Sequence, residues 1–244
     1  MIASFIDMLN RYKFVWLTAV FMILFIRLGL WQLHRAQEKE WLLQKFAERA
    51  QHKPLSGNEL SNLSWSNSLY YQVQLIGKYD NFHTFYLDNK TFQGQAGYEI
   101  FTPFKAEGFA TPILVDRGWL PAGASRAALP KVSAESMAMA SGTLTPAPHF
   151  FALGSVFDGT TPSWPLRIEF MDLQILSKLL GYSLFPYILS LDSATTAGLT
   201  RTWQIVIMPP EKHRGYALQW FAFALTVFIL FVALNWNARK KNED

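Results

Sequence analysis

Two long hydrophobic runs lie near the ends of the chain and contrast with the more polar stretch between them. The first run extends from Phe14 to Leu33 and the second from Tyr216 to Trp236. Each has about 20 residues, the length that an α-helix needs to cross a hydrocarbon core of about 30 Å. We therefore predict two transmembrane helices. A cleavable signal peptide explains the first run poorly, because the run is too long and no small-residue cleavage site follows it.

One charge, Arg27, interrupts the first run. A charged side chain inside a span is costly, so it should reach the membrane surface, face a partner or touch a ligand. Arg27 lies within two turns of the end of the run, which favours the first of these three explanations.

The pattern between the runs begins as a helix and then changes to the period of β-strands. From His34 to about Gln51, apolar residues recur at helical spacing, which predicts an amphipathic extension of the first span. From Leu69 onward, short alternating runs are divided by Gly, Pro and Asn, with a turn expected at Asp88–Asn89. The predicted strands lie in YYQVQLIGKY, TFYLDNKTF, GYEIFTPF, TPILVDRGWLP, ASGTLTP, RIEF, PYILSLD and TWQIVIMPP.

A helix is predicted from about Asp172 to Gly181, and a mobile loop from Ala122 to Ala140. The fold class is therefore an α+β membrane protein. Two transmembrane helices bracket one β-rich extracytoplasmic domain, which is an antiparallel sheet or a small open barrel with short helices.

The charges beside the spans predict how the chain crosses the membrane. Short basic tails favour the cytoplasmic side, whereas a long domain translocates largely regardless of its charge. We therefore predict a cytoplasmic tail at 1–12, transmembrane helices at 13–33 and 213–236, a periplasmic domain at 34–212 and a second cytoplasmic tail at 237–244. Without an Arg- and Ser-rich transit segment, the expected location is a bacterial inner membrane.

Composition limits the possible chemistry. The 244 residues include no Cys, which excludes disulfides, iron–sulfur clusters and thiolate catalysis. The net charge of +4 is too mild to indicate a nucleic-acid partner. No nucleophile elbow, phosphate loop, dinucleotide fingerprint or zinc-protease motif is present, so we do not expect an enzyme. His52, His83 and His149 stand alone, without a second metal ligand at helical spacing.

The edges of the two spans carry the strongest candidates for a site. One face of the second helix carries, at spacings of three and four, His213, Tyr216, Ala217, Trp220 and Ala224. That face offers an imidazole, an aromatic wall and small residues where a flat ring could approach. Arg214 could meet a carboxylate of a ligand. A belt of interfacial aromatic residues and ordinary boundary charges is the alternative explanation.

The first helix ends in LGLWQLHR, where Arg27, Trp31 and His34 share a face and Arg35 lies at the boundary. Gly29 allows another helix to approach closely. In the predicted domain, DRGWLP (Asp116 to Pro121) is expected to end a strand in a compact turn, and we place a folding role for this stretch above a contact role for Arg117.

Together these motifs resemble the Surfeit-locus family, also called Surf or Shy, whose members assist assembly of haem–copper cytochrome oxidases. The resemblance rests on GLWQLHR, DRGWLP and HRGYALQWF, in this order between two spans. It implies two transmembrane helices around an extracytoplasmic domain, and a role in maturing oxidase subunit I near the insertion of haem a. In this chain Lys212 and Arg214 flank the matching His213, and Asp116 leads the Arg-Gly-Trp motif, where the family often has other residues.

The resemblance also implies the roles of individual residues. In some bacterial members a His at the start of the second span binds haem iron, which matches His213 here. The leading hypothesis is therefore an assembly factor that holds haem a transiently at the outer membrane edge, with His213 as axial ligand. The residues expected to shield the ring or pair with propionates are Trp220, Tyr216, Trp31, Arg214 and Arg35. His34 is a second possible ligand.

The expected partners are oxidase subunit I, haem a synthase and the lipid bilayer, with no nucleic acid. The alternative hypothesis is a scaffold that binds no haem and stabilises subunit I during assembly. A third is an extracytoplasmic sensor or an enzyme with an unfamiliar motif, although a short basic tail argues against a sensor.

Overall fold

The computed structural model describes residues 2–123, 129–132, 137–148, 155–157, 162–192, 199–201 and 203–240, with the backbone alone for 2–11 and 237–240. The chain forms two compact units. The helical unit combines Met1–Gln44 with Ile205–Asp244, and the β-rich unit is Lys45–Gln204.

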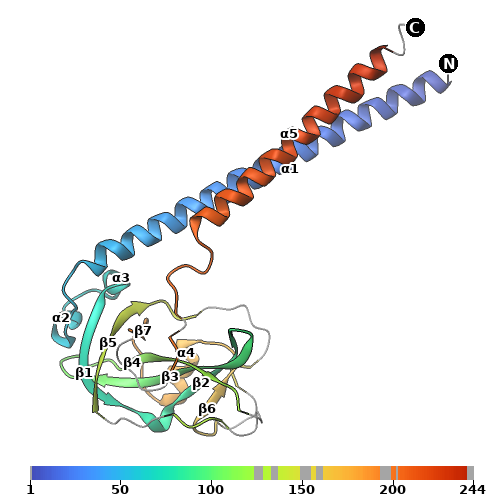
Figure 1. Ribbon diagram of the computed structural model, residues 1–244. Coiled ribbons are helices and arrows are strands. Elements are labelled where there is room, and N and C mark those ends of the chain that lie inside the picture. The colour runs from blue at the N-terminus through green and yellow to red at the C-terminus, as the bar shows by residue number, and fades with distance from the viewer. Residues whose placement is uncertain are drawn as a thin grey trace. The chain divides into compact units, whose positions relative to one another are not determined.

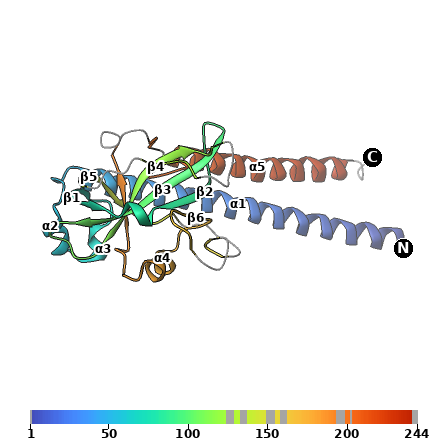
Figure 2. The ribbon, with the colours of Figure 1, turned by 90° about the horizontal axis from the view of Figure 1, so that it is seen from below.

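The helical unit consists of two antiparallel helices, α1 (Ile2–Ala50) and α5 (Pro210–Lys240). Figures 1 and 2 show them side by side, with both chain termini at the same end. The stretches Tyr12–Ala50 and Pro210–Trp236 are long and apolar enough to cross a membrane. Both hydrophobic runs are thus confirmed as long apolar helices. The sequence prediction that the first continues as a helix to about Gln51 is also confirmed.

The last turns of α1 belong to the β-rich unit and contact it directly. Phe46 packs against Tyr70 and Trp203, with ring centroids 6.4 and 6.0 Å away. Arg49 donates a hydrogen bond to the carbonyl oxygen of Leu69 and lies over the ring of Tyr71, 4.7 Å from its centroid. Arg49 therefore holds the last turn of α1 against the segment that precedes β1.

The β-rich unit is built around one seven-stranded sheet. Its strands are β1 (Gln72–Tyr79), β2 (Phe85–Phe92), β3 (Gln95–Ala106), β4 (Ile113–Pro121), β5 (Met137–Thr145), β6 (Leu166–Ile168) and β7 (Ile188–Leu191). Their order is β1-β5-β7-β4-β3-β2-β6, and β1 also pairs with β3. The extra pairing closes β1, β5, β7, β4 and β3 into a small barrel, and β2 and β6 continue the sheet beyond β3.

Barrel closure depends on a glycine in β1. Gly77 pairs with Ala106 of β3, and a Cβ atom at Gly77 would lie 2.1 Å from the carbonyl oxygen of Lys105. A side chain there would push the two strands apart, so glycine permits the close approach.

The sheet differs in two respects from the expectation of an open, antiparallel arrangement. It is mixed, because β2 pairs with β6 and β4 pairs with β7 in parallel. It also closes, through three paired positions between β1 and β3. The α+β class with two flanking helices is confirmed.

Apolar side chains fill the barrel and cover its outer side. The interior contains Val73, Leu75, Phe104, Ile113, Val115, Leu144 and Leu189. A second cluster joins β2 and β6 to helix α4 (Leu173–Leu180), whose Leu176 is fully buried (Figure 2). Asp172 caps the start of α4 and Gly181 ends it with φ 76°, as the sequence predicted. Short helices α2 (Gly57–Ser61), α3 (Trp65–Ser68) and η1 (Asn81–His83) complete the unit.

Three local predictions were wrong. Asp88–Asn89 is not a turn but a bulge inside β2, where Asn89 has φ 60° and the register with β3 shifts. Trp203–Pro209, expected to be a strand, has no regular structure. The predicted loop Ala122 to Ala140 lies partly outside the described residues, but its last four residues, from Met137, belong to β5.

Candidate functional site

Two of the residues predicted to form a site at the span edges, His213 and Trp220, lie along the contact between α1 and α5, which we call the helical seam. Its small or polar members on α1 are Thr18, Gly29, Gln32 and Ala36, and those on α5 are His213, Ala217 and Ala224. Successive positions are three, four, seven or eleven residues apart, which are sums of the steps of three and four that keep residues on one face of a helix. A Cβ at Gly29 would lie 2.5 Å from the ring of Phe221, so this glycine permits the close packing that the sequence indicated.

His213 occupies the seam near the start of α5. Its residue is only 8% exposed, and its Nδ1 lies 2.8 Å from Oε1 of Gln32. The amide oxygen can only accept, so Nδ1 donates to it, and in the neutral form of the ring Nε2 would carry the lone pair. Nε2 exposes less than 1 Å² and has no hydrogen-bond partner in the part of the chain that is described. The seam thus fixes the orientation of the imidazole through Gln32 and leaves Nε2 without a partner among the described residues.

The two arginines predicted to meet propionates already have carboxylate partners. Arg214 forms an ion pair with Glu40 across the helix pair. Arg35 donates to Glu38 at 2.6 Å, and the same carboxylate accepts from His34 Nε2 at 3.2 Å. All these side chains are more than a third exposed, so each pair is weak and exchangeable.

The three predicted aromatic residues lie in different places. Trp220 is half-buried and stacks on Phe25 of α1 with ring centroids 5.8 Å apart. Tyr216 and Trp31 are 45% and 52% exposed. The structure therefore brings Trp220 to the seam with His213, whereas Tyr216 and Trp31 lie on exposed faces of their helices.

Sequence reasoning did not identify the roles of Gln32 and Glu40. Gln32 follows Phe25 by seven residues and Gly29 by three, so it continues the buried stripe of α1. A polar residue on such a stripe signals an interhelical hydrogen bond. The partner became visible only with the antiparallel register of the two helices.

The DRGWLP motif forms a bulge inside β4, not a turn at its end. Ile100 of β3 pairs with Gly118 and Phe101 pairs with Asp116, so Arg117 is the extra residue. Gly118 has φ 111°, and a Cβ there would lie 2.7 Å from the carbonyl oxygen of Thr200. The predicted turn was wrong because a glycine with positive φ suits a bulge as well as a turn.

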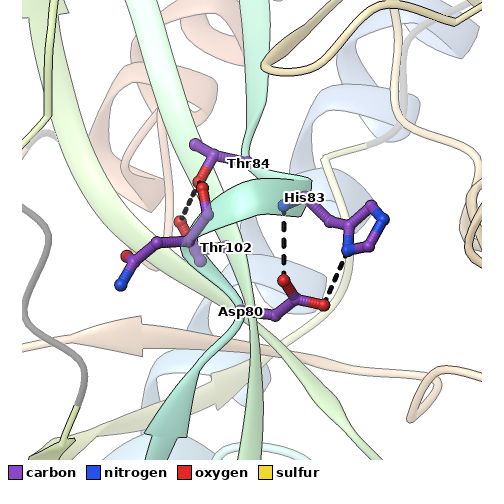
Figure 3. A network of polar contacts seen from close by, with 5 residues as sticks. Asp80, His83, Thr84 and Thr102 are labelled. Carbon is purple, nitrogen blue, oxygen red and sulfur yellow. Dashed lines mark hydrogen bonds and ion pairs between the residues drawn. The ribbon is translucent and has the colours of Figure 1, made fainter.

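Arg117 serves the fold of the β-rich unit. It is 2% exposed, its guanidinium lies 4.9 Å from the centroid of the Tyr79 ring, and Nη1 donates to Oδ1 of Asn81 at 3.4 Å. Asn81 begins the short helix η1, and Figure 3 shows Asp80 and His83 at the same turn. There Asp80 accepts hydrogen bonds from the backbone and ring nitrogens of His83, the latter at 2.7 Å, and the hydroxyls of Thr84 and Thr102 lie 3.2 Å apart. These contacts form a structural support for the barrel.

The neighbouring carboxylates are also buried. Burial, together with the carboxylate of Glu99, raises the pKa of Asp116 well above its ordinary value, although the backbone N–H of Gly118 donates to it at 2.9 Å. Burial also lowers the pKa of Lys90 and of Arg201. Acidic and basic groups thus interact in a buried cluster, in which the guanidinium nitrogens of Arg201 have no hydrogen-bond partner among the described residues.

Metal-binding clusters are absent from the described residues, in which no three His, Asp or Glu side chains gather in a suitable arrangement. His83 pairs with Asp80, His52 packs on Tyr71 with ring centroids 5.6 Å apart, and His149 lies outside these residues. Among the histidines described, His213 alone is buried with an unpartnered ring nitrogen.

Comparison with known proteins agrees with this architecture. A model of the SURF1 family matches residues 19–225, from within α1 to within α5. A SURF1-like protein of Rickettsia bellii (strain RML369-C) is 24% identical over 215 residues, which cover 86% of this chain and 85% of that protein. The family match covers the whole β-rich unit and every named member of the helical seam except Thr18. The chain therefore belongs to the SURF1 family, a family of oxidase assembly factors.

Proposed function

We propose that this protein assists insertion of haem a into subunit I of a haem–copper cytochrome oxidase by binding haem a transiently through His213. Family membership supports the role in oxidase assembly. The observation that carries the haem proposal is the pairing of His213 Nδ1 with Gln32 Oε1 at 2.8 Å, next to an unpartnered Nε2.

This arrangement is the one that a haem ligand needs. Histidines that bind metals usually donate their other ring nitrogen to an oxygen atom, which fixes the tautomer and raises the basicity of the coordinating nitrogen. Gln32 supplies that oxygen from the neighbouring helix. A buried acceptor without a hydrogen bond is costly, by about 1–3 kcal/mol, and coordination of iron would remove that cost.

The burial of Nε2 makes this a closed form of the site. A porphyrin would reach Nε2 only if α1 and α5 separated around His213 and Gln32, or if the imidazole turned outward. The packing there favours such a change, because small residues such as Ala36 and Ala217 bury little area. In the open form Arg214 would release Glu40 and pair with a haem propionate, and Arg35 would release Glu38 and pair with a propionate as well. Both new ion pairs would favour the open form.

Haem a, if bound, would supply an iron atom that accepts a nitrogen ligand, and His213 would provide that nitrogen. The other tasks fall to the chain. Gln32 orients the imidazole, the two arginines meet negative charge, and Trp220 with Phe25 excludes water from the deeper seam. The strength of binding must stay moderate, since the protein has to release haem to subunit I. Closing of the seam after release provides the competing state.

The location and partners follow from the same proposal. The two apolar helices anchor the protein in a bacterial inner membrane with both termini in the cytoplasm and the β-rich unit in the periplasm. Subunit I receives the haem and haem a synthase supplies it. No step in this account makes or breaks a covalent bond in a substrate, so the protein acts as a carrier and not as an enzyme.

A scaffold that binds no haem is the second candidate. The observation that favours it is the closed state of the seam, in which Arg214, Arg35 and His34 all have partners within the chain. In this account the helices only anchor the barrel, and the barrel stabilises subunit I.

The two candidates are separated by the spectrum of the purified protein. We would purify the full chain from cells that make haem a, and compare wild type with His213→Ala, Gln32→Leu and His34→Ala. Haem binding predicts a Soret band that disappears in His213→Ala and persists in His34→Ala. In Gln32→Leu the affinity should fall by about 10- to 100-fold, because the ligand loses its orienting oxygen. A wild-type protein that copurifies with subunit I but has no Soret band would establish the scaffold.

A further inference from the structure

The face of α1 opposite the helical seam carries a charge in the middle of apolar residues. The exposed residues at spacings of three and four along this face are Trp16, Val20, Ile23, Arg27, Leu30 and His34. We call this set the outer stripe. At 100° per residue, Arg27 lies about 160–200° around the helix from Phe25 and Gly29, which face α5.

Arg27 has no hydrogen bond or ion pair with any residue that the structure describes. The nearest described carboxylate on the same face is that of Glu38, which already pairs with His34 and Arg35. A haem on His213 cannot provide the partner either, because His213 lies on the opposite side of α1, hydrogen-bonded to Gln32.

The position of Arg27 within two turns of the end of the apolar run favours a reach to the lipid phosphates, but the direction of its side chain opposes that reach. Arg27 lies about 9 Å from the end of the apolar run at Leu33 and about 20 Å from its start at Phe14. Side chains on a helix lean toward its N-terminus, so Arg27 leans toward the membrane centre and away from the nearer surface. Contact with lipid explains why the apolar members of the stripe are exposed. It does not explain Arg27, because a charged side chain inside a membrane span is costly unless it has a partner.

We infer that the outer stripe of α1 docks a transmembrane helix of another protein, and that this helix presents a carboxylate to Arg27. Charge complementarity decides the occupant: a second copy of α1 would place one arginine against another, whereas an acidic side chain would neutralise Arg27. The apolar residues on either side, Ile23 and Leu30, would pack against the same helix. A single polar position in an apolar stripe fixes the register of two helices, so Arg27 would determine how the partner sits.

This inference rests on the proposed function for the identity of the partner, because an assembly factor for subunit I must contact a protein made of transmembrane helices. The test uses the tagged full chain in cells that produce the oxidase and measures how much subunit I is recovered with it. We expect Arg27→Leu to reduce recovery by about tenfold and Arg27→Lys to retain most of it, since one interhelical polar contact in a membrane is worth about 1–2 kcal/mol.

Lys13→Leu is the matched control, because it removes one exposed positive charge from the same helix outside the apolar run. It should leave recovery unchanged. A photo-reactive residue at Ile23 should crosslink to subunit I, and the Soret band of Arg27→Leu should equal that of wild type because the seam is untouched.

The outcomes separate this inference from the proposed function. If Arg27→Leu recovers as much subunit I as wild type, and Ile23 crosslinks only to lipid, the docking surface is wrong and the assembly role stands. If wild type itself recovers no subunit I, the proposed partner is wrong and the docking surface falls with it.

Discussion

The helical seam and the bulge in β4 both bury polar side chains beside a glycine, yet they treat these side chains differently. At the bulge, Arg117 lies on Tyr79 and donates to Asn81, and the acidic groups of Asp116 and Glu99 interact with the buried guanidinium of Arg201. At the seam, His213 has one partner, Gln32, and its second nitrogen has none that the described residues supply. A buried cluster of acidic and basic side chains from several strands maintains a fold, whereas a single oriented imidazole whose Nε2 has no partner among the described residues is suited to a ligand.

The largest effect should follow from filling the bulge. Gly118→Val should destabilise the protein by about 3 kcal/mol or more, because φ 111° strains an L-residue and the new Cβ would meet the Thr200 carbonyl oxygen at 2.7 Å. Thermal unfolding of the full chain in detergent measures this change. Gly123→Ala is the control, since a Cβ there meets nothing within 4 Å. Equal stability of the two variants would contradict the structural role of the bulge.

A smaller effect is expected where the glycine faces a side chain. A Cβ at Gly29 would lie 2.5 Å from the Phe221 ring, so Gly29→Val should weaken the seam by about 1–3 kcal/mol. The chain lacks cysteine, so a pair introduced at Phe14 and Phe231, whose rings are 6.1 Å apart, reports helix pairing by its rate of oxidation.

In that assay Gly29→Val should slow the crosslink and added Phe221→Ala should restore it, while Gly215→Ala, which meets nothing within 4 Å, should change nothing. Failure of the second substitution to restore the rate would show that the contact does not hold the helices together.

The smallest effect concerns pH. Because the pKa of Asp116 is raised in the folded state, mainly by burial, the folded protein binds this proton more tightly than the unfolded chain does. The stability that protonated Asp116 contributes is therefore fully present at pH values below the pKa of Asp116 in the unfolded chain. This stability is lost as the pH rises through the pKa of Asp116 in the folded protein, by at most about 1.4 kcal/mol per pH unit. Asp116→Asn mimics the protonated form and should remove this loss.

The measurement for Asp116 is the unfolding midpoint of wild type and variant as a function of pH. The two should agree in acid and diverge as pH rises, with the variant more stable. Glu169→Gln, at an exposed carboxylate, should follow wild type at every pH. A constant offset between Asp116→Asn and wild type would mean that the buried carboxyl does not titrate in this range.

Local signals in the sequence predicted the helices and many of the strands well. The apolar runs, the Asp172 cap and Gly181 each act over a few residues, so they could be read without a structure. The same signals were ambiguous at Asn89 and Gly118, since a positive φ serves a turn and a bulge alike. The alternation around Ile205 and Ile207 suggested a strand, but Ile207 is 91% exposed, and no neighbouring strand pairs with this segment among the described residues.

Pairings between distant segments were the part that the sequence could not reveal. The parallel contacts of β6 and β7 and the closure of β1 on β3 depend on how loops bring strands together. In the site, the spacing of α5 predicted His213 and Trp220 on one face, and both lie in or beside the seam. The contacts of Gln32 and Glu40 with α5 could be predicted only from the register between the two helices. These helices are separated by more than 150 residues, and Gln32 and His213 are 181 residues apart in the sequence.

The central claim is that Nε2 of His213 binds haem iron, and chemical rescue tests it most directly. The Soret band of the purified His213→Ala protein would be recorded with haem a before and after addition of free imidazole, beside His34→Ala treated in the same way. The account predicts no band without imidazole and a restored band with it, because the small ligand fills the space of the lost side chain. A His213→Ala protein that binds haem a as well as wild type, before any imidazole is added, would contradict the account.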